Sequence, residues 1–444
     1  MKSSGWRLET AGLSRREFLA WASMSALALV TGCATNPVTG RRELMLVSEE
    51  EEMRMDRSAA PHQFSADYGP VADAALNAYV GEVGARLVAC SHRPQAPFSF
   101  RVVNAVYANA YTFPAGSVAV TRGLLLELRD EAELAALLGH EIGHVCARHT
   151  ARAMSWGTLG ALVVSGASLY LGREDERRGE LVAGLGQLAG GALLARYSRA
   201  NEREADALAM DYMVRAGYSP DGMVGLMDVL RSLSHSRPGL VELLFATHPM
   251  SEERYHTARE RVQSRYAAQR GQLTNRERFL ERTAELRGHG VAIRAWQAGE
   301  EALARGNWNT ARQQISAGLR EVPDDYTGRL LLAKCCLAEK QFAEARQQAE
   351  AAHRTYPAEA QALLVMGVAA LGQKEFVAAR EAFERYGELL PGNPNVVFLE
   401  GYSLEGMNRR DEAARCYVQY LRAGGEGEFA VHARKRLAEW GYLK

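Results

Sequence analysis

The stretch Leu134–Met154 reads LAALLGHEIGHVCARHTARAM and contains His140, Glu141 and His144 in the spacing His-Glu-x-x-His. Asp130 stands just before it, where a carboxylate can cap the first turn of a helix. Apolar residues then recur at helical intervals, namely Leu134, Leu137, Leu138, Ile142 and Val145. On a helix, positions i and i+4 share a face, so both imidazoles can reach one metal ion while the glutamate leans over the same point. The stretch therefore predicts the metal-binding helix of a zinc hydrolase.

The same letters could arise by chance, from two core histidines and a solvated glutamate, but only 11 of the 444 residues are histidine. A third ligand is needed, and the extension that metzincins use is missing, since Ala147 and Thr150 stand where that pattern has Gly and His. His149 comes one residue early. At i+5 from His144 it should point off the metal face, so we expect a surface or supporting histidine there.

The segment Ser198–Gly217, SRANEREADALAMDYMVRAG, supplies a better candidate. Glu202 and Asp206 stand one helical turn apart on a stripe continued by Ala205, Ala209 and Met213. A carboxylate on an apolar stripe is costly to bury unless it is paired or binds a metal, so Glu202 is predicted to complete a His2Glu zinc site that leaves one position for water. Asp206 can accept the spare ring N–H of a zinc-bound histidine, with a surface salt bridge as the alternative. Glu204 is expected to be solvated.

Three motifs in this order resemble one known family. GHEIGHV at 139–145, SRANEREAD at 198–206 and THPMSEER at 247–254 are similar to the motifs of the zinc metallopeptidases that include the CAAX prenyl protease and HtpX. The resemblance covers residues 34–265 and is strongest to the periplasmic, BepA-like form of the family. It implies a gluzincin-type metallopeptidase with a small sheet and an edge strand beside the zinc helix.

The resemblance also implies roles for individual residues. Zinc, one ion per chain, would be held by His140, His144 and Glu202. Glu141 would be the general base, and His248 would be an oxyanion stabiliser or a zinc ligand of the resting state. From sequence alone, His248 before a proline reads equally well as an ordinary extended turn. Arg254 is then expected to be a structural partner of a buried carboxylate.

Upstream of the zinc helix, Phe98–Asn104 and Gly116–Thr121 alternate as strands do. The stretch NAYTFPAGSVAVTRGLL, at 109–125, resembles the edge strand of the family. An exposed edge would let an extended peptide add as a further strand through main-chain hydrogen bonds, which suits a protease that accepts many sequences. A plain core hairpin is the alternative, but it gives no role to Asn109.

Residues 1–33 read as an export signal. Residues 14–19, SRREFL, resemble the twin-arginine motif, Ala20–Thr31 is a short apolar run, and residues 30–33, VTGC, resemble a bacterial lipobox. Cleavage before Cys33 would leave a lipid anchor followed by a polar linker over 34–60. Ala34, rather than Asp, after the cysteine favours the outer membrane. The expected location is therefore the periplasm, tethered to a membrane.

Composition excludes some classes. The chain has 53 basic and 53 acidic residues, so nothing suggests a nucleic-acid partner. Its six cysteines show no paired spacing, and no disulfide framework is predicted. Between the zinc motifs, residues 156–195 hold two Gly- and Ala-rich apolar runs separated by charges. We expect a lid over the active site, because each run is too short to span a membrane readily. A segment that touches the membrane is the alternative.

The last third of the chain repeats every 34 residues. Prolines recur at Pro323, Pro357 and Pro391, and alanines at Ala311, Ala345, Ala379 and Ala413. This is the tetratricopeptide period, with two helices per unit. We expect four repeats over Val291–Gly424 and a capping helix over Phe429–Tyr442. Such arrays are binding surfaces more often than catalysts, and a spacer or a lid is the alternative.

The sequence as a whole predicts a mainly α protein in which a zinc metallopeptidase domain, 61–270, is joined by a connector, 271–290, to an α-solenoid of repeats, 291–444. The resemblance implies an endopeptidase of the cell envelope that degrades misfolded or stalled outer-membrane proteins. The repeats would dock substrate or the outer-membrane assembly machinery. The alternative is a chaperone or assembly adaptor whose protease is mostly silent.

Overall fold

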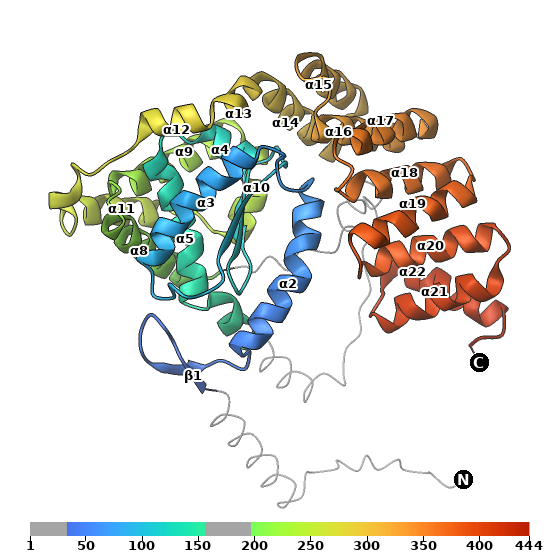
Figure 1. Ribbon diagram of the computed structural model, residues 1–444, viewed down its shortest axis with the longest axis horizontal. Coiled ribbons are helices and arrows are strands. Elements are labelled where there is room, and N and C mark those ends of the chain that lie inside the picture. The colour runs from blue at the N-terminus through green and yellow to red at the C-terminus, as the bar shows by residue number, and fades with distance from the viewer. Residues whose placement is uncertain (1–32, 156–196, 444) are drawn as a thin grey trace, which may run out of the picture.

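The computed structural model describes residues 33–155 and 197–443, which fold into a helical bundle with a small sheet and an array of helix pairs (Figure 1). The expected mainly α architecture is confirmed. No helix within these two ranges is long and apolar enough to cross a membrane. The predictions for residues 1–32 and 156–195 concern segments outside the described residues.

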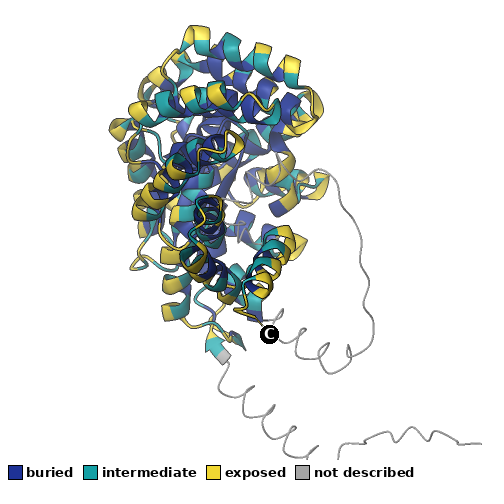
Figure 2. Ribbon diagram, turned by 90° about the vertical axis from the view of Figure 1, so that its right-hand side faces the viewer, coloured by how far each residue is buried: buried dark blue, intermediate teal, exposed yellow. Residues whose placement is uncertain are grey.

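The bundle is built around helix α5 (Glu131–Cys146), every residue of which is buried. Apolar side chains cover most of its surface, and its buried charged and imidazole side chains have polar partners on neighbouring elements. Figure 2 colours the buried residues dark blue, and those of the bundle belong to a cluster that extends into the first repeats. The helices that enclose α5 or pack on its neighbours are α3 (Ala74–Ala89), α8 (Arg199–Arg215), α9 (Asp221–Ser236), α10 (Pro238–Thr247) and α11 (Glu252–Gln263).

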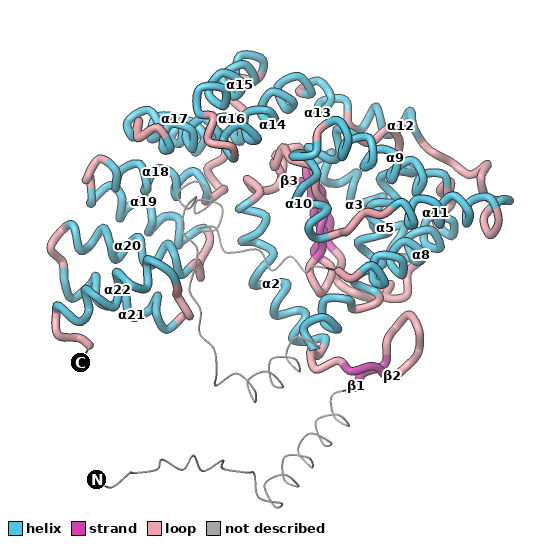
Figure 3. The backbone as a smooth tube through the Cα atoms, turned by 180° about the vertical axis from the view of Figure 1, so that it is seen from behind, coloured by secondary structure: helices cyan, strands magenta, loops and turns pink. Residues whose placement is uncertain are grey.

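The sheet has three strands in the order β3-β5-β4. They are β3 (Ser99–Val103), β4 (Ala110–Thr112) and β5 (Ser117–Thr121), with β3 parallel and β4 antiparallel to β5. Both expected strands are confirmed, and β4, from the stretch compared with an edge strand, lies at an edge and contacts α5. Figure 3 shows the sheet in magenta between α2 and the helices of the bundle.

The predicted linker over 34–60 is wrong. This segment forms β1 (Cys33–Thr35), β2 (Arg42–Leu44) and most of helix α2 (Glu49–Ala66). Ser48 and Glu51 form a capping box at the start of α2. The acidic run resembles a solvated linker, but Glu52 is fully buried and accepts a 2.9 Å hydrogen bond from Arg148 Nε. Partners so distant in sequence cannot be read from local composition.

The segment predicted as a connector, 271–290, lies between the bundle and the repeats and contains two short helices. A short 3₁₀ turn at Ala267–Gln269 is followed by helices α12 (Arg276–Arg282) and α13 (Ala284–Gly288). Helix α12 packs on α3 and α5. Phe279 is fully buried, and Arg278 Nη1 lies 3.0 Å from the buried Glu131 carboxylate. One aromatic anchor and one ion pair dock this segment although it contains few apolar residues.

The tetratricopeptide prediction is confirmed in the helix pairs that follow. The pairs are α14 (Gly290–Ala304) with α15 (Trp308–Glu321), α16 (Tyr326–Ala338) with α17 (Phe342–Thr355), α18 (Gln361–Gly372) with α19 (Phe376–Leu389), and α20 (Pro394–Gly406) with α21 (Arg410–Arg422). Helix α22 (Gly427–Glu439) caps the array. Small residues mark the helix crossings, since a methyl group at Gly367 would overlap the ring of Phe383.

The first repeats are bound to the bundle by buried polar contacts. Arg122, the first residue of helix α4 (Arg122–Glu127), forms a two-pronged ion pair with Asp325 at 2.6 and 3.0 Å. Gln297 Nε2 donates to the carbonyl of Val106 at 2.8 Å. Bidentate Arg-carboxylate pairs fix geometry as well as adding energy, so the array is held in one orientation to the bundle.

Candidate metal centre

Close packing of α5 against α8 creates the site. Asp130 caps α5 by accepting from the Glu133 N–H at 2.9 Å, as its position predicts. Gly139 and Gly143 present no side chain to α8, and a methyl group at Gly139 would lie 3.2 Å from Ala209 Cα. The two helices therefore approach closely, and the carboxylates of α8 reach the histidines of α5.

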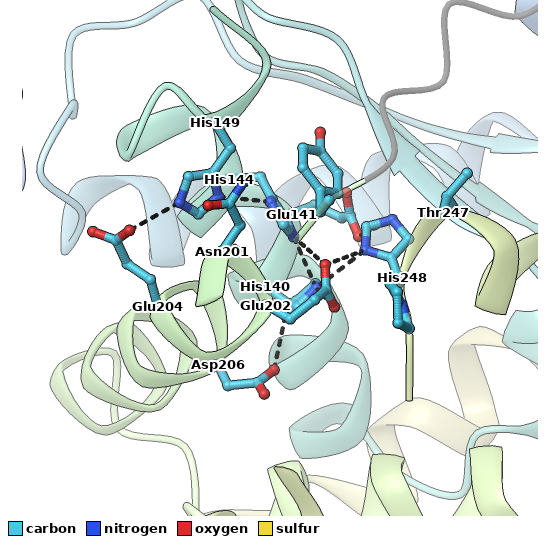
Figure 4. A network of polar contacts seen from close by, with 12 residues as sticks. His140, Glu141, His144, His149, Asn201, Glu202, Glu204, Asp206, Thr247 and His248 are labelled. Carbon is cyan, nitrogen blue, oxygen red and sulfur yellow. Dashed lines mark hydrogen bonds and ion pairs between the residues drawn. The ribbon is translucent and has the colours of Figure 1, made fainter. Parts of the chain in front are cut away.

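Four buried side chains point at one place: His140, His144, Glu202 and His248 (Figure 4). One nitrogen or oxygen from each lies within 4.8 Å of the others. The Nε2 atoms of His140 and His144 are 3.0 Å apart, and both lie 3.3 to 3.4 Å from a Glu202 oxygen. His248 Nδ1 lies 3.2 Å from Glu202 Oε1 and 3.4 Å from His140 Nε2.

These distances fit a metal ion. A tetrahedral ion with bonds near 2.0–2.1 Å separates its ligand atoms by about 3.3–3.4 Å. Two imidazole nitrogens that face each other at 3.0 Å also need a proton or a cation between them. Three nitrogens and a carboxylate form a donor set that suits zinc. The residues predicted as ligands, with His248 as a fourth, can therefore hold such an ion.

His140 is held by the carboxylate that the sequence proposed. Its Nδ1 lies 3.0 Å from Asp206 Oδ1. Arg254 donates to both Asp206 oxygens at 2.7 Å and lies 2.7 Å from Glu202 Oε2. Burial opposes ionisation of Asp206, but the charges and hydrogen bonds of Arg254 and His140 together hold the pKa of Asp206 below its usual value. Arg254 is thus the partner of two buried carboxylates.

His144 is held from the opposite side by residues that the sequence did not connect with it. Its Nδ1 lies 2.8 Å from Nδ1 of His149, whose Nε2 lies 3.0 Å from Glu204 Oε2. The expectation that Glu204 is solvated is wrong, because this carboxylate is half-buried against His149 and Arg152. His149 does point away from the metal cluster, as expected, but it supports a ligand instead of facing the surface.

The end of α5 explains this arrangement. The helix stops at Cys146, and Arg148 adopts a left-handed backbone with φ +52°. The chain therefore leaves the helical path before His149, and this ring packs on the side of His144 that faces away from the metal cluster. No local signal marks Arg148 as the turning point, since glycine and asparagine are the usual residues there. The bond from Arg148 to Glu52 of α2 holds the turn.

Two further features complete the site. The Tyr197 ring stacks on His144, with 3.7 Å between centroids, a contact that no sequence pattern predicts. Glu141 is buried, its Oε1 lies 3.9 Å from His248 Nε2, and its Oε2 has no hydrogen-bond partner among the described residues. Burial raises the pKa of Glu141, which suits a proton acceptor. It borders an apolar pocket of about 30 Å³, room for a water molecule rather than a side chain.

Comparison with known families gives this geometry a context. Residues 74–262 match the family model of peptidase family M48. This matched region, called the M48-like domain below, contains all of the clustered side chains, and residues 297–359 and 340–394 match the tetratricopeptide repeat.

Curated relatives match part of this chain. A putative beta-barrel assembly-enhancing protease of Vibrio cholerae is 33% identical over 229 residues, 49% of this chain and 44% of the relative. The beta-barrel assembly-enhancing protease of Yersinia pestis is 33% identical over 228 residues, 49% of this chain and 45% of the relative. Metalloprotease YcaL of Escherichia coli is 33% identical over 174 residues, 38% of this chain and 63% of the relative. The matched region spans less than half of the first two relatives.

Proposed function

We propose that this chain is a zinc-dependent endopeptidase of the bacterial cell envelope that degrades misfolded or stalled outer-membrane proteins. One observation carries the proposal: three predicted ligands converge with His248 beside a buried glutamate, Glu141, whose Oε2 is unpartnered. A structural metal site has no need of such a carboxylate. The names of the Vibrio and Yersinia relatives support the class of substrate.

Each residue of the site has a definite task in hydrolysis. Zinc, when bound, supplies a Lewis acid that makes water more acidic and polarises a peptide carbonyl. Glu141 accepts the proton of the attacking water at Oε2 and returns it to the leaving amine. Asp206 and Arg254 hold the ring of His140 in place. His248 either occupies the position that water needs or stabilises the developing oxyanion.

The substrate would bind as an extended strand along β4. This strand lies at the sheet edge and contacts α5, which carries Glu141. Main-chain pairing at an edge is tolerant of side-chain identity. Backbone recognition therefore suits an enzyme that must accept many unfolded sequences, and the repeats would deliver substrate or dock the assembly machinery of the outer membrane.

The proposed location depends on the export signal in residues 1–33. The arginine pair and the lipobox support secretion and lipidation at Cys33. Cys33→Ser should abolish labelling of the chain by radioactive fatty acid in growing bacteria. Ala34→Ser, a matched control, should be labelled as the wild type is. Normal labelling of the Cys33→Ser protein would contradict a lipid anchor.

The enzyme is tested with purified protein and an unfolded β-barrel substrate. We expect slow cleavage by the zinc-loaded wild type, no cleavage after chelation of zinc, and no cleavage by Glu141→Gln. The matched control is Glu133→Gln, a helix-cap neighbour that lies outside the metal cluster. Cleavage by Glu141→Gln at the wild-type rate would show that Glu141 is not the general base and would contradict the proposed mechanism.

The second candidate is a chaperone or assembly adaptor with a mostly silent protease. The small pocket beside Glu141 and the approach of His248 to the ligand cluster favour it, because both leave little room for a peptide. Suppression of aggregation of an unfolded β-barrel protein separates the two. Equal suppression by wild type and Glu141→Gln, with no cleavage by either, would support the adaptor.

A further inference from the structure

We propose that Glu204 and His149 act as positioning residues for His144, in a relay separate from the Asp206–Arg254 pair that holds His140. The relay is defined as Glu204, His149 and His144 Nδ1. This inference rests on the proposed metal site and adds to it two residues outside the ligand set. It predicts that metal affinity depends on a carboxylate that touches no metal ligand.

The three side chains of the relay are joined by a continuous series of hydrogen-bond contacts. Glu204 Oε2 lies 3.0 Å from His149 Nε2, and His149 Nδ1 lies 2.8 Å from His144 Nδ1. His144 Nε2, on the far side of its ring, lies 3.0 Å from His140 Nε2 within the metal cluster. Figure 4 shows this series of contacts running from Glu204 through both rings to the cluster.

The donor and acceptor properties of these groups allow only one direction of hydrogen-bond donation along the relay. An ionised carboxylate only accepts, so Glu204 requires a proton on His149 Nε2. In a neutral ring the other nitrogen then carries a lone pair, so His149 Nδ1 accepts from His144 Nδ1. That bond places the remaining lone pair of His144 on Nε2, the atom that faces the metal. Reversing any one bond would put a proton where the metal must bind.

The surroundings hold the relay in place. His149 is fully buried, and the left-handed Arg148 before it is tied to Glu52 of α2. Arg152, one turn beyond Arg148, links Glu204 at 3.3 Å to Glu43 of β2 at 3.1 Å. The N-terminal segment 33–66 thus supports the relay from outside. This support gives a physical reason why the segment folds onto the M48-like domain.

The test is zinc affinity, measured by competition with a chromophoric chelator. Glu204→Ala and His149→Leu should each bind zinc about 10- to 100-fold more weakly than the wild type, the usual effect of losing a group that orients a ligand. His149→Asn offers an oxygen close to the lost Nδ1 and should bind zinc more tightly than His149→Leu. The control Glu253→Ala removes an exposed carboxylate of α11 and should leave affinity unchanged.

Nitrogen NMR of the zinc-loaded protein gives a second readout. The wild type should show His144 protonated at Nδ1 and His149 protonated at Nε2. Equal zinc affinity in Glu204→Ala and Glu253→Ala, or equal losses in the Asn and Leu variants of His149, would overturn the relay. A wild type that binds no zinc would instead contradict the proposed function, so the two failures are distinguishable.

Discussion

Replacing Arg254 by Met should strongly destabilise the M48-like domain when no metal is bound. The guanidinium donates to both oxygens of Asp206 at 2.7 Å and lies 2.7 Å from Glu202. Without it, the buried carboxylates of Glu202 and Asp206 keep only the ring of His140 between them. Removing one partner of a buried ion pair costs about 3–5 kcal/mol. A domain of this size loses about 2–4 °C of Tm per kcal/mol, so the expected fall is about 6–20 °C.

Calorimetry in chelator and in excess zinc measures the effect. The control is Arg203→Met, which removes an exposed pair with Glu253 at 3.3 Å. Exposed pairs contribute about 0–1 kcal/mol, so its Tm should fall by no more than about 4 °C. Zinc beside Glu202 should restore part of the loss in Arg254→Met, because ligand binding stabilises the folded state. Equal Tm values for the two variants in chelator would refute this account of Arg254.

Three further predictions concern the metal and the interface with the repeats. At saturating zinc, Glu202→Ala should lose the metal while Glu204→Ala keeps about one zinc per chain by elemental analysis; equal loss would show that Glu202 is not the ligand. His248→Ala should keep zinc and change the cleavage of an unfolded protein, with a rise if the ring occupies the water position and a fall if it stabilises the oxyanion; an unchanged rate would make it an ordinary turn residue. Glu300 of α14 faces Tyr68, which follows α2, and the Tyr68 hydroxyl lies 3.5 Å from Glu300 Oε1. Burial raises the pKa of Glu300 from 4.5 to about 7, so the folded state binds a proton that the unfolded state has released. Stability should therefore fall as pH rises from 4.5 to 7, and denaturation of Glu300→Gln should show a weaker fall.

The sequence was most informative where a pattern is local. The apolar spacing around His140 predicted α5, and the 34-residue period predicted the helix pairs of the repeats. Glu202 and Asp206 could be placed near the histidines because a carboxylate on an apolar stripe demands a partner. Their partner Arg254 came from the resemblance to a known family and not from any spacing.

The sequence was least informative where distant segments meet. Glu52 looks like one member of an acidic linker, and only the fold shows that it pairs with Arg148 beyond the end of α5. The left-handed backbone of Arg148 then moves His149 off the helical projection and onto His144. Tyr197 reaches the same ring from a separate segment. Such contacts depend on tertiary packing, which periodicity and composition do not encode.

The central claim is that Glu141 is the proton acceptor of a zinc site built by α5 and α8. Its most direct test is zinc content and peptidase activity measured on the same preparation of Glu141→Gln. The amide keeps the shape of the side chain but cannot take a proton, so we expect about one zinc per chain and a loss of nearly all cleavage. Retained zinc with wild-type activity would contradict the claim.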